Sequence, residues 1–99
     1  MVTLINVFTV DPANQQRLIE ILTAATEATV RSAKGFVSAT LHKGVDGTKV
    51  TMVAQWQSLA DYQALRNNPA PQKFLAEALA IATFEPGLYE AVETFMSAA

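Results

Sequence analysis

The only histidine and the only tryptophan of the chain, His42 and Trp56, fall on two strand-like segments that flank a turn. A neutral imidazole can accept a proton near pH 7, and an indole ring can stack on an aromatic ligand. Residues two apart share one face of a strand, which groups His42 with Thr40 and Trp56 with Met52. We therefore expect these four side chains to meet above one surface of a sheet and to line a pocket.

Each of these residues also has a purely structural interpretation. His42 stands beside Lys43 near a hairpin tip, where an exposed histidine is often only a surface residue. Trp56 is equally suited to anchoring a core or a dimer interface. Arg66 follows Tyr62 by four residues on a predicted helix and shares its face. This pair either closes a pocket mouth or forms a solvated helix edge.

Asn6 places an amide in the middle of an apolar strand, on the same face as Leu4 and Phe8. A buried amide that finds no hydrogen-bond partner costs about 1–3 kcal/mol. A cross-strand group or a trapped water would be the structural partner, and a ligand oxygen would be the functional one. We favour the ligand oxygen and count Phe8 among the residues that contact it.

The elements that position these residues follow from the hydrophobic pattern. The β-branched, apolar segment 2–10 predicts a central strand. Asp11 and Pro12 form an N-cap and first helical residue, and apolar residues at helical spacing predict a helix of about 20 residues that ends before Gly35. Segments 36–43 and 49–56 predict a hairpin through Asp46-Gly47.

The second half of the chain predicts two helices and a strand. Ser58, with Asp61 three residues later, begins one helix. Pro69 and Pro71 interrupt it at about residue 67, and a short helix follows over about 71–80. A Pro86-Gly87 turn then leads into a last strand at 88–95.

This order of elements is the split βαβ, or ferredoxin-like, α+β arrangement in a single domain over residues 1–99. Both helices should cover one face of a four-stranded antiparallel sheet. The chain is 51% hydrophobic and 16% charged, with a mean hydropathy of +0.20. Because the bare sheet face is too apolar for water, we expect a homodimer in which two protomers enclose a chamber.

Several classes of function are disfavoured by the composition. The 7 basic and 9 acidic residues are scattered, which disfavours nucleic-acid binding, and no apolar run approaches a membrane span. The chain lacks cysteine, and one histidine cannot build a zinc site without it. The first ten residues indicate a strand rather than a signal peptide, so we expect a cytoplasmic protein.

The motifs GFVSATLH, DGT and AQW, followed by Tyr62, resemble the antibiotic biosynthesis monooxygenase family. The start VFTVDPANQQRLIEIL is also similar to its first strand and helix, so the resemblance covers residues 2–95. It implies a dimeric α+β barrel with a pocket in each subunit. It also implies oxidation of phenolic polyketides to quinones by O2 without flavin, haem or metal. By this resemblance Trp56 and Tyr62 occupy pocket positions and His42 stands where members carry a histidine, whereas Met52 replaces their catalytic asparagine.

Three functions therefore stand as expectations. The first is a homodimeric, cofactor-independent monooxygenase for an aromatic or quinol-type substrate, with His42 as the base, Asn6 on the substrate oxygen and Trp56 at the reacting ring. The further residues expected to bind substrate are Met52, Tyr62, Phe8, Thr40 and Arg66. The second is a non-catalytic dimeric module for a small apolar ligand, which Met52 favours. The third is haem binding or degradation, for which Asn6 and Trp56 fit but the required helical histidine is missing.

Overall fold

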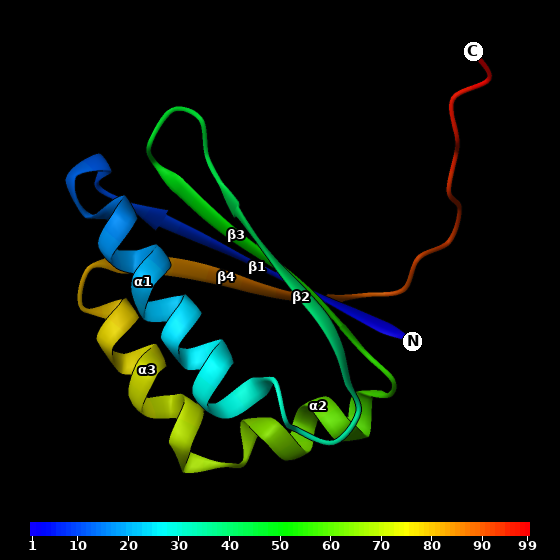
Figure 1. Ribbon diagram of the computed structural model, residues 1–99, viewed down its shortest axis with the longest axis horizontal. Helices are drawn as coiled ribbons and strands as arrows, with labels where there is room; N and C mark the ends of the chain where they lie inside the picture. Colours follow the sequence, from blue (N-terminus) through cyan, green and yellow to red (C-terminus); the bar gives the residue numbers. More distant parts are fainter.

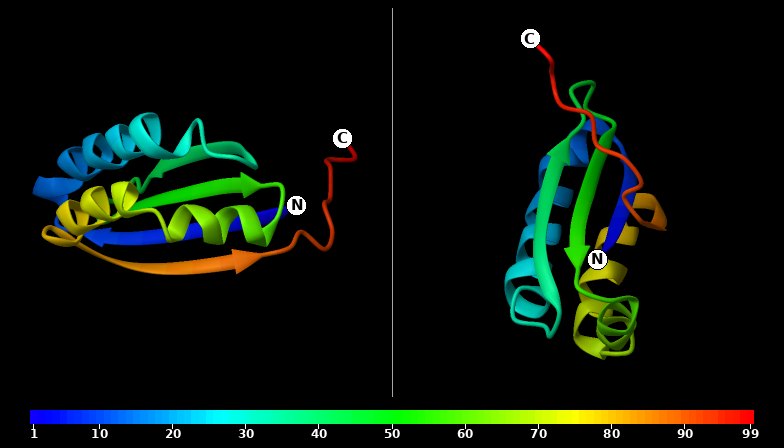
Figure 2. Two further views of the ribbon diagram at one scale, coloured as in Figure 1. Left: turned by 90° about the horizontal axis from the view of Figure 1, so that it is seen from below. Right: turned by 90° about the vertical axis from the view of Figure 1, so that its right-hand side faces the viewer.

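The computed structural model describes residues 1–99 and has one antiparallel sheet of four strands in the order β2-β3-β1-β4. The strands are β1 (Val2–Val10), β2 (Phe36–Lys43), β3 (Lys49–Trp56) and β4 (Ala82–Tyr89). All helices lie on one side of the sheet and leave the other side open (Figure 1; Figure 2, left). The predicted ferredoxin-like α+β fold is confirmed.

The helical layer contains five segments. These are η1 (Pro12–Asn14), α1 (Gln15–Ala25), η2 (Thr26–Val30), α2 (Leu59–Arg66) and α3 (Pro69–Leu79). The predicted caps are present, because Asp11 accepts a hydrogen bond from the Ala13 N–H at 2.9 Å and Ser58 accepts one from the Asp61 N–H at 3.1 Å. None of the helices combines the length and the hydrophobicity needed to cross a membrane.

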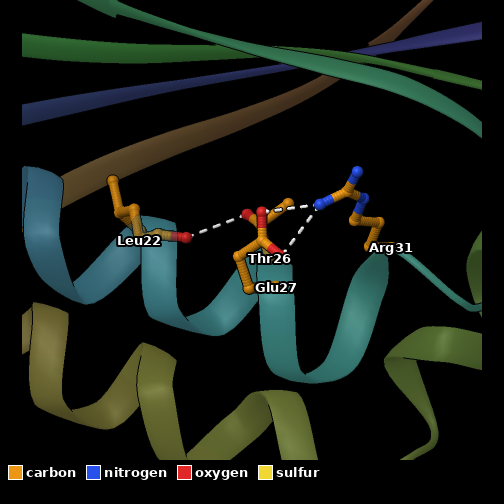
Figure 3. Close-up of polar contacts among 4 residues, drawn as sticks. All are labelled: Leu22, Thr26, Glu27 and Arg31. Carbon is orange, nitrogen blue, oxygen red and sulfur yellow. Dashed lines mark hydrogen bonds and ion pairs between the residues drawn. The ribbon is translucent and has the colours of Figure 1, made fainter.

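The first helical stretch ends in a π-turn that the sequence pattern does not predict. In η2 the Arg31 N–H donates to the Thr26 carbonyl, five residues back, at 2.9 Å. The Thr26 hydroxyl also donates to the Leu22 carbonyl at 2.8 Å, and Arg31 pairs with Glu27 at 3.0 Å (Figure 3). These contacts support the wider turn, which places Val30 beside the sheet.

The β2–β3 hairpin is tied to the start of α1. Gly47 has a φ of 87°, which glycine adopts without steric penalty, so the predicted turn is present. Gln15 is the one buried polar residue, and its Nε2 donates to the carbonyls of Gly44 and Lys49, each at 3.0 Å. This anchor fixes the hairpin against the helix layer.

The prediction for the last strand was wrong. Pro86 and Gly87 lie inside β4, which runs from residue 82 to residue 89, and residues 90–99 form no strand. β4 is an edge strand that pairs only with β1, so one side of its backbone needs no partner and proline is tolerated there. The tail after β4 extends away from the body of the molecule (Figure 1).

The hairpin register also corrects the expectation that His42 and Thr40 share a face with Trp56 and Met52. From Ser38 to Lys43, the five-residue loop pairs even-numbered residues of β2 with odd-numbered residues of β3, so that His42 lies opposite Thr51. Cross-strand partners point to the same side of a sheet. His42 and Thr40 therefore project from the open face, whereas Trp56 and Met52 face the helices.

The core beneath the helices has two parts. The larger, here called the packed cluster, consists of Phe8, Val10, Leu18, Ile21, Leu22, Val50 and Ala78. The smaller, here called the tryptophan cluster, consists of Leu4, Ala54, Trp56 and Tyr62. Phe36 and Tyr62 both contact the Trp56 ring edge-to-face, with centroid distances of 5.4 and 5.9 Å. The tryptophan cluster borders the candidate site.

Candidate functional site

A cavity of about 130 Å³ lies between the sheet and the helices, beside the tryptophan cluster. It is lined by Leu4, Asn6, Val30, Met52, Ala54, Trp56, Tyr62, Leu65, Arg66, Leu75 and Phe84. Nine of these 11 residues are hydrophobic. An engineered apolar cavity of about 150 Å³ binds benzene, so this space accommodates about one aromatic ring.

Two buried polar atoms at this cavity have no hydrogen-bond partner: the Asn6 Oδ1 and the Trp56 Nε1. The cause for Asn6 is its register, because its neighbours across the sheet are Met52 on β3 and Pro86 on β4. Neither side chain offers an amide, hydroxyl or charged group. Buried polar groups are normally paired, and an unpaired one marks a place where a ligand or water completes the structure.

Tyr62 and Arg66 form the polar side of the cavity. The Tyr62 hydroxyl accepts a hydrogen bond from the Arg66 Nη1 at 2.9 Å, and the guanidinium carbon lies 5.9 Å from the centroid of the tyrosine ring. Tyr62 is only 6% exposed, whereas Arg66 is exposed to solvent. Since its oxygen already accepts from Arg66, the tyrosine O–H remains free to donate to a ligand.

The structure brings together five of the eight residues predicted for the site. Asn6, Met52, Trp56, Tyr62 and Arg66 all line the cavity. The remaining three, Phe8, Thr40 and His42, lie outside the cavity.

Phe8 belongs to the packed cluster and stacks on Phe84 with a centroid distance of 5.1 Å, so only Phe84 reaches the cavity. His42 and Thr40 are exposed on the open face of the sheet. Within one subunit, the candidate base and the candidate substrate-oxygen ligand therefore stand on opposite sides of β1–β3.

Sequence reasoning missed several lining residues. Val30 reaches the cavity through the π-turn, which no sequence period indicates. Leu75 and Phe84 depend on how α3 and β4 pack on the sheet. Leu65 could have been found, since it follows Tyr62 by three residues and shares its helix face.

The cavity offers hydrogen-bond donors and an amide but no obvious base. No carboxylate or imidazole is among the lining residues, and no group of three or more His, Cys, Asp or Glu side chains gathers anywhere in the structure. The indole N–H and the phenol O–H both favour an oxygen that carries negative charge. The arrangement is therefore suited to binding and stabilising the anion of a hydroxyaromatic ring.

Comparison with known proteins shows the family of the chain. Residues 1–77 match the family described as antibiotic biosynthesis monooxygenase. Tetracenomycin-F1 monooxygenase of Streptomyces glaucescens is 38% identical over 93 residues, which cover 94% of this chain and 83% of that protein. The chain belongs to this monooxygenase family.

Solved structures of family members share the fold of this monooxygenase. SnoaB of Streptomyces nogalater, a cofactor-independent oxygenase, aligns with a TM-score of 0.83 and 25% identity, covering 97% of each chain. The ActVA-Orf6 monooxygenase of Streptomyces coelicolor, solved with the ligand nanaomycin D, aligns with a TM-score of 0.86 and 25% identity, covering 98% of this chain and 92% of that one.

Proposed function

We propose that this monooxygenase oxidises a phenolic or related hydroxyaromatic substrate to a quinone with O2 and without a cofactor. The observation that carries the proposal is the pair of unpartnered polar atoms, on Asn6 and Trp56, in an otherwise apolar cavity of one-ring size. The known activities of the family members support the same chemistry, since one is a tetracenomycin-F1 monooxygenase and another a cofactor-independent oxygenase.

Binding comes first in the proposed mechanism. The substrate ring enters the apolar space against Trp56, and its hydroxyl group donates to the Asn6 Oδ1 and accepts from the Trp56 N–H. The Tyr62 O–H donates to a second oxygen of the substrate, toward the solvent side of the cavity. Donors aimed at an oxygen stabilise its anionic form and lower its pKa, so the proton leaves to water at the cavity mouth.

Oxidation then uses the electrons of the substrate itself. The anion gives one electron to O2, and the resulting aryloxyl radical and superoxide combine to form a carbon–oxygen bond at a ring carbon. The peroxide anion then takes up a proton from water. Loss of water leaves a second carbonyl group. For a naphthol the balance is C10H8O + O2 → C10H6O2 + H2O, so one oxygen atom enters the product and the other leaves as water. The surrounding apolar side chains exclude bulk water from the radical pair.

Oxygen uptake tests this function. Purified protein is supplied with anthrones and dihydroxynaphthalenes, and uptake above the rate without protein is measured together with the quinone formed. We expect Asn6→Ala and Trp56→Phe each to lower the rate about tenfold, which corresponds to loss of one hydrogen bond to the reacting hydroxyl group.

The control for this test is Asn14→Ala, because Asn14 makes no side-chain cap hydrogen bond and lies outside the cavity. Uptake that depends on the protein but is unchanged in Asn6→Ala and Trp56→Phe would exclude the cavity as the reaction site. Absence of uptake with every electron-rich phenol would exclude the proposed reaction.

A second candidate function is ligand binding without turnover, and Met52 is the observation that favours it. By family resemblance this wall position carries a catalytic asparagine, and a thioether cannot donate a hydrogen bond. Asn6 lies directly opposite Met52 and is our proposed replacement. Met52→Asn separates the two functions, since it should restore or raise oxygen uptake only in a chain whose other catalytic groups are in place.

Haem degradation has less support than either of these functions. It requires a histidine on the helix that follows Trp56, and the only histidine of the chain is exposed on the opposite face of the sheet. A Soret shift on addition of haemin, lost in Trp56→Phe, would reverse this ranking.

Pairing of two chains through the open sheet face is also part of the proposal. Ile5, Val7 and Val53 lie at the centre of that face and remain partly exposed. The tail adds further apolar surface, with Val92 94% and Phe95 88% exposed. Sedimentation at micromolar concentration should report a dimer, and a stable monomer would contradict it. The cytoplasmic location expected from the sequence stays a prediction.

A further inference from the structure

Arg66 is the only charged residue that lines the cavity, and it has no carboxylate partner. The chain has three arginines, and the other two are paired: Arg17 with Glu77 at 2.7 Å and Arg31 with Glu27 at 3.0 Å. Arg66 instead donates to the neutral Tyr62 hydroxyl. Its remaining N–H groups are thus available at the solvent side of the cavity.

A simpler role for Arg66 is to place positive charge at the C-terminal end of α2, which it ends. That role is served by any cation directed into solvent. The Arg66 guanidinium instead turns back onto the Tyr62 ring and hydroxyl, at the edge of the cavity. This orientation places the Arg66 guanidinium where it can bind a substrate group that projects from the cavity beside Tyr62.

The cavity volume supports this interpretation. About 130 Å³ holds about one aromatic ring, so the rest of a fused-ring substrate must project outward past the polar side. The ring hydroxyl would lie inside, at Asn6 and Trp56. A substituent at the opposite end of the molecule would then reach Arg66.

We propose that the substrate carries a carboxylate at the end remote from its reacting hydroxyl, and that Arg66 binds this carboxylate. The planar guanidinium fork matches a carboxylate with two parallel hydrogen bonds. This inference rests on the proposed function, because it takes the cavity as the place where the substrate ring binds. It adds the chemical class of the substrate: a hydroxyaromatic acid rather than a neutral phenol.

Calorimetric titration with three probes tests the inference without requiring turnover. 6-Hydroxy-2-naphthoate has its hydroxyl and carboxylate at opposite ends, its methyl ester removes the charge, and 2-naphthol removes the group. We expect the acid to bind roughly five- to tenfold more tightly than the ester, a size appropriate to a partly exposed charged pair. The difference should shrink in about 1 M salt, where the Debye length is ~3 Å.

Three variants test whether Arg66 causes the preference for the acid over the ester. Arg66→Gln should bind acid and ester equally while keeping the affinity for the ester. Arg66→Lys should keep part of the preference, because it retains the charge but not the fork. Arg17→Gln removes an equal charge from a surface pair outside the cavity and should bind the acid as the unmodified protein does.

Equal affinity for acid and ester in the unmodified protein would overturn the inference, as would a preference that survives Arg66→Gln. Failure of all three probes to bind would overturn it together with the cavity assignment. Oxygen uptake with a neutral anthrone separates the two proposals, because it does not require Arg66. Uptake without any preference for the acid would leave the proposed function standing and remove only the carboxylate.

Discussion

The two parts of the core differ in how completely they are filled. In the packed cluster, side chains from α1, α3 and the sheet contact one another, and Leu18, Val50 and Ala78 have no exposed surface. The tryptophan cluster is equally buried but borders a cavity and includes a polar atom without a partner. The first region contributes stability, whereas the second retains unfilled space and unsatisfied polarity that a ligand can use.

The largest effect should come from the packed cluster. Leu18→Ala removes a fully buried side chain and should lower the free energy of unfolding by about 3 kcal/mol, through lost burial and a new cavity. Urea denaturation followed by circular dichroism measures the change. Turnover per folded molecule should stay as it was. A loss below about 1 kcal/mol would mean that this region is not closely packed.

Asn6→Leu should instead leave the protein at least as stable but lower its activity. Replacing an amide whose buried Oδ1 lacks a partner by an apolar side chain should raise the free energy of unfolding by about 1 kcal/mol, while oxygen uptake falls at least tenfold. The same denaturation and uptake measurements apply, with Asn14→Leu as the control. A marked loss of stability would show that the Asn6 amide has a structural partner and is not reserved for a ligand.

A smaller effect is expected at the hairpin tip, which lies at the packed end. The Asp46 pKa is lowered from its usual 3.8, first by the hydrogen bond from the Thr48 N–H and then by that from the Thr48 hydroxyl. A lowered folded-state pKa gives stability that is present above pH 3.8 and is lost as the pH falls through the folded value.

The Asp46→Asn variant tests the direction in which this contribution to stability changes with pH. The unmodified protein should be more stable than the variant near neutral pH, and the difference should shrink as the pH falls below 3.8. Thermal unfolding at a series of pH values measures the difference. A gap that widens on acidification would contradict the assigned direction.

The smallest effect should follow from His42→Ala, since His42 is exposed on the open face. Its stability should change by no more than about 0.5 kcal/mol, and its affinity for naphthol ligands should not change. A fall in oxygen uptake with unchanged dimerisation would return the catalytic role to His42 and require a route from the open face to the substrate.

The sequence predicted most of the fold because the signals were local and consistent. The β-branched segment 2–10, the Ser58 cap and the glycine turn each indicated the element that is present. The last strand failed because proline usually ends a strand, and only its place at a sheet edge allows Pro86 inside β4.

The site was predictable only in part, for a reason of register. Asn6 and Tyr62 were found because an amide in an apolar strand and an aromatic residue on a helix face are visible locally. The grouping of His42 with Trp56 failed, because the face that each strand presents depends on the loop between them. One residue more or less in that loop would move His42 to the same face of the sheet as Trp56. Val30 depends on a π-turn and could not have been foreseen.

That π-turn has an evolutionary consequence. Deleting a single residue from η2 would return it to α-helical winding and remove the wider turn that places Val30 at the cavity. The strands that carry Asn6 and Trp56 would keep their pairing. Single-residue insertions and deletions at this helix end thus give descendants of the chain a way to change the shape of the cavity while Asn6 and Trp56 keep their positions.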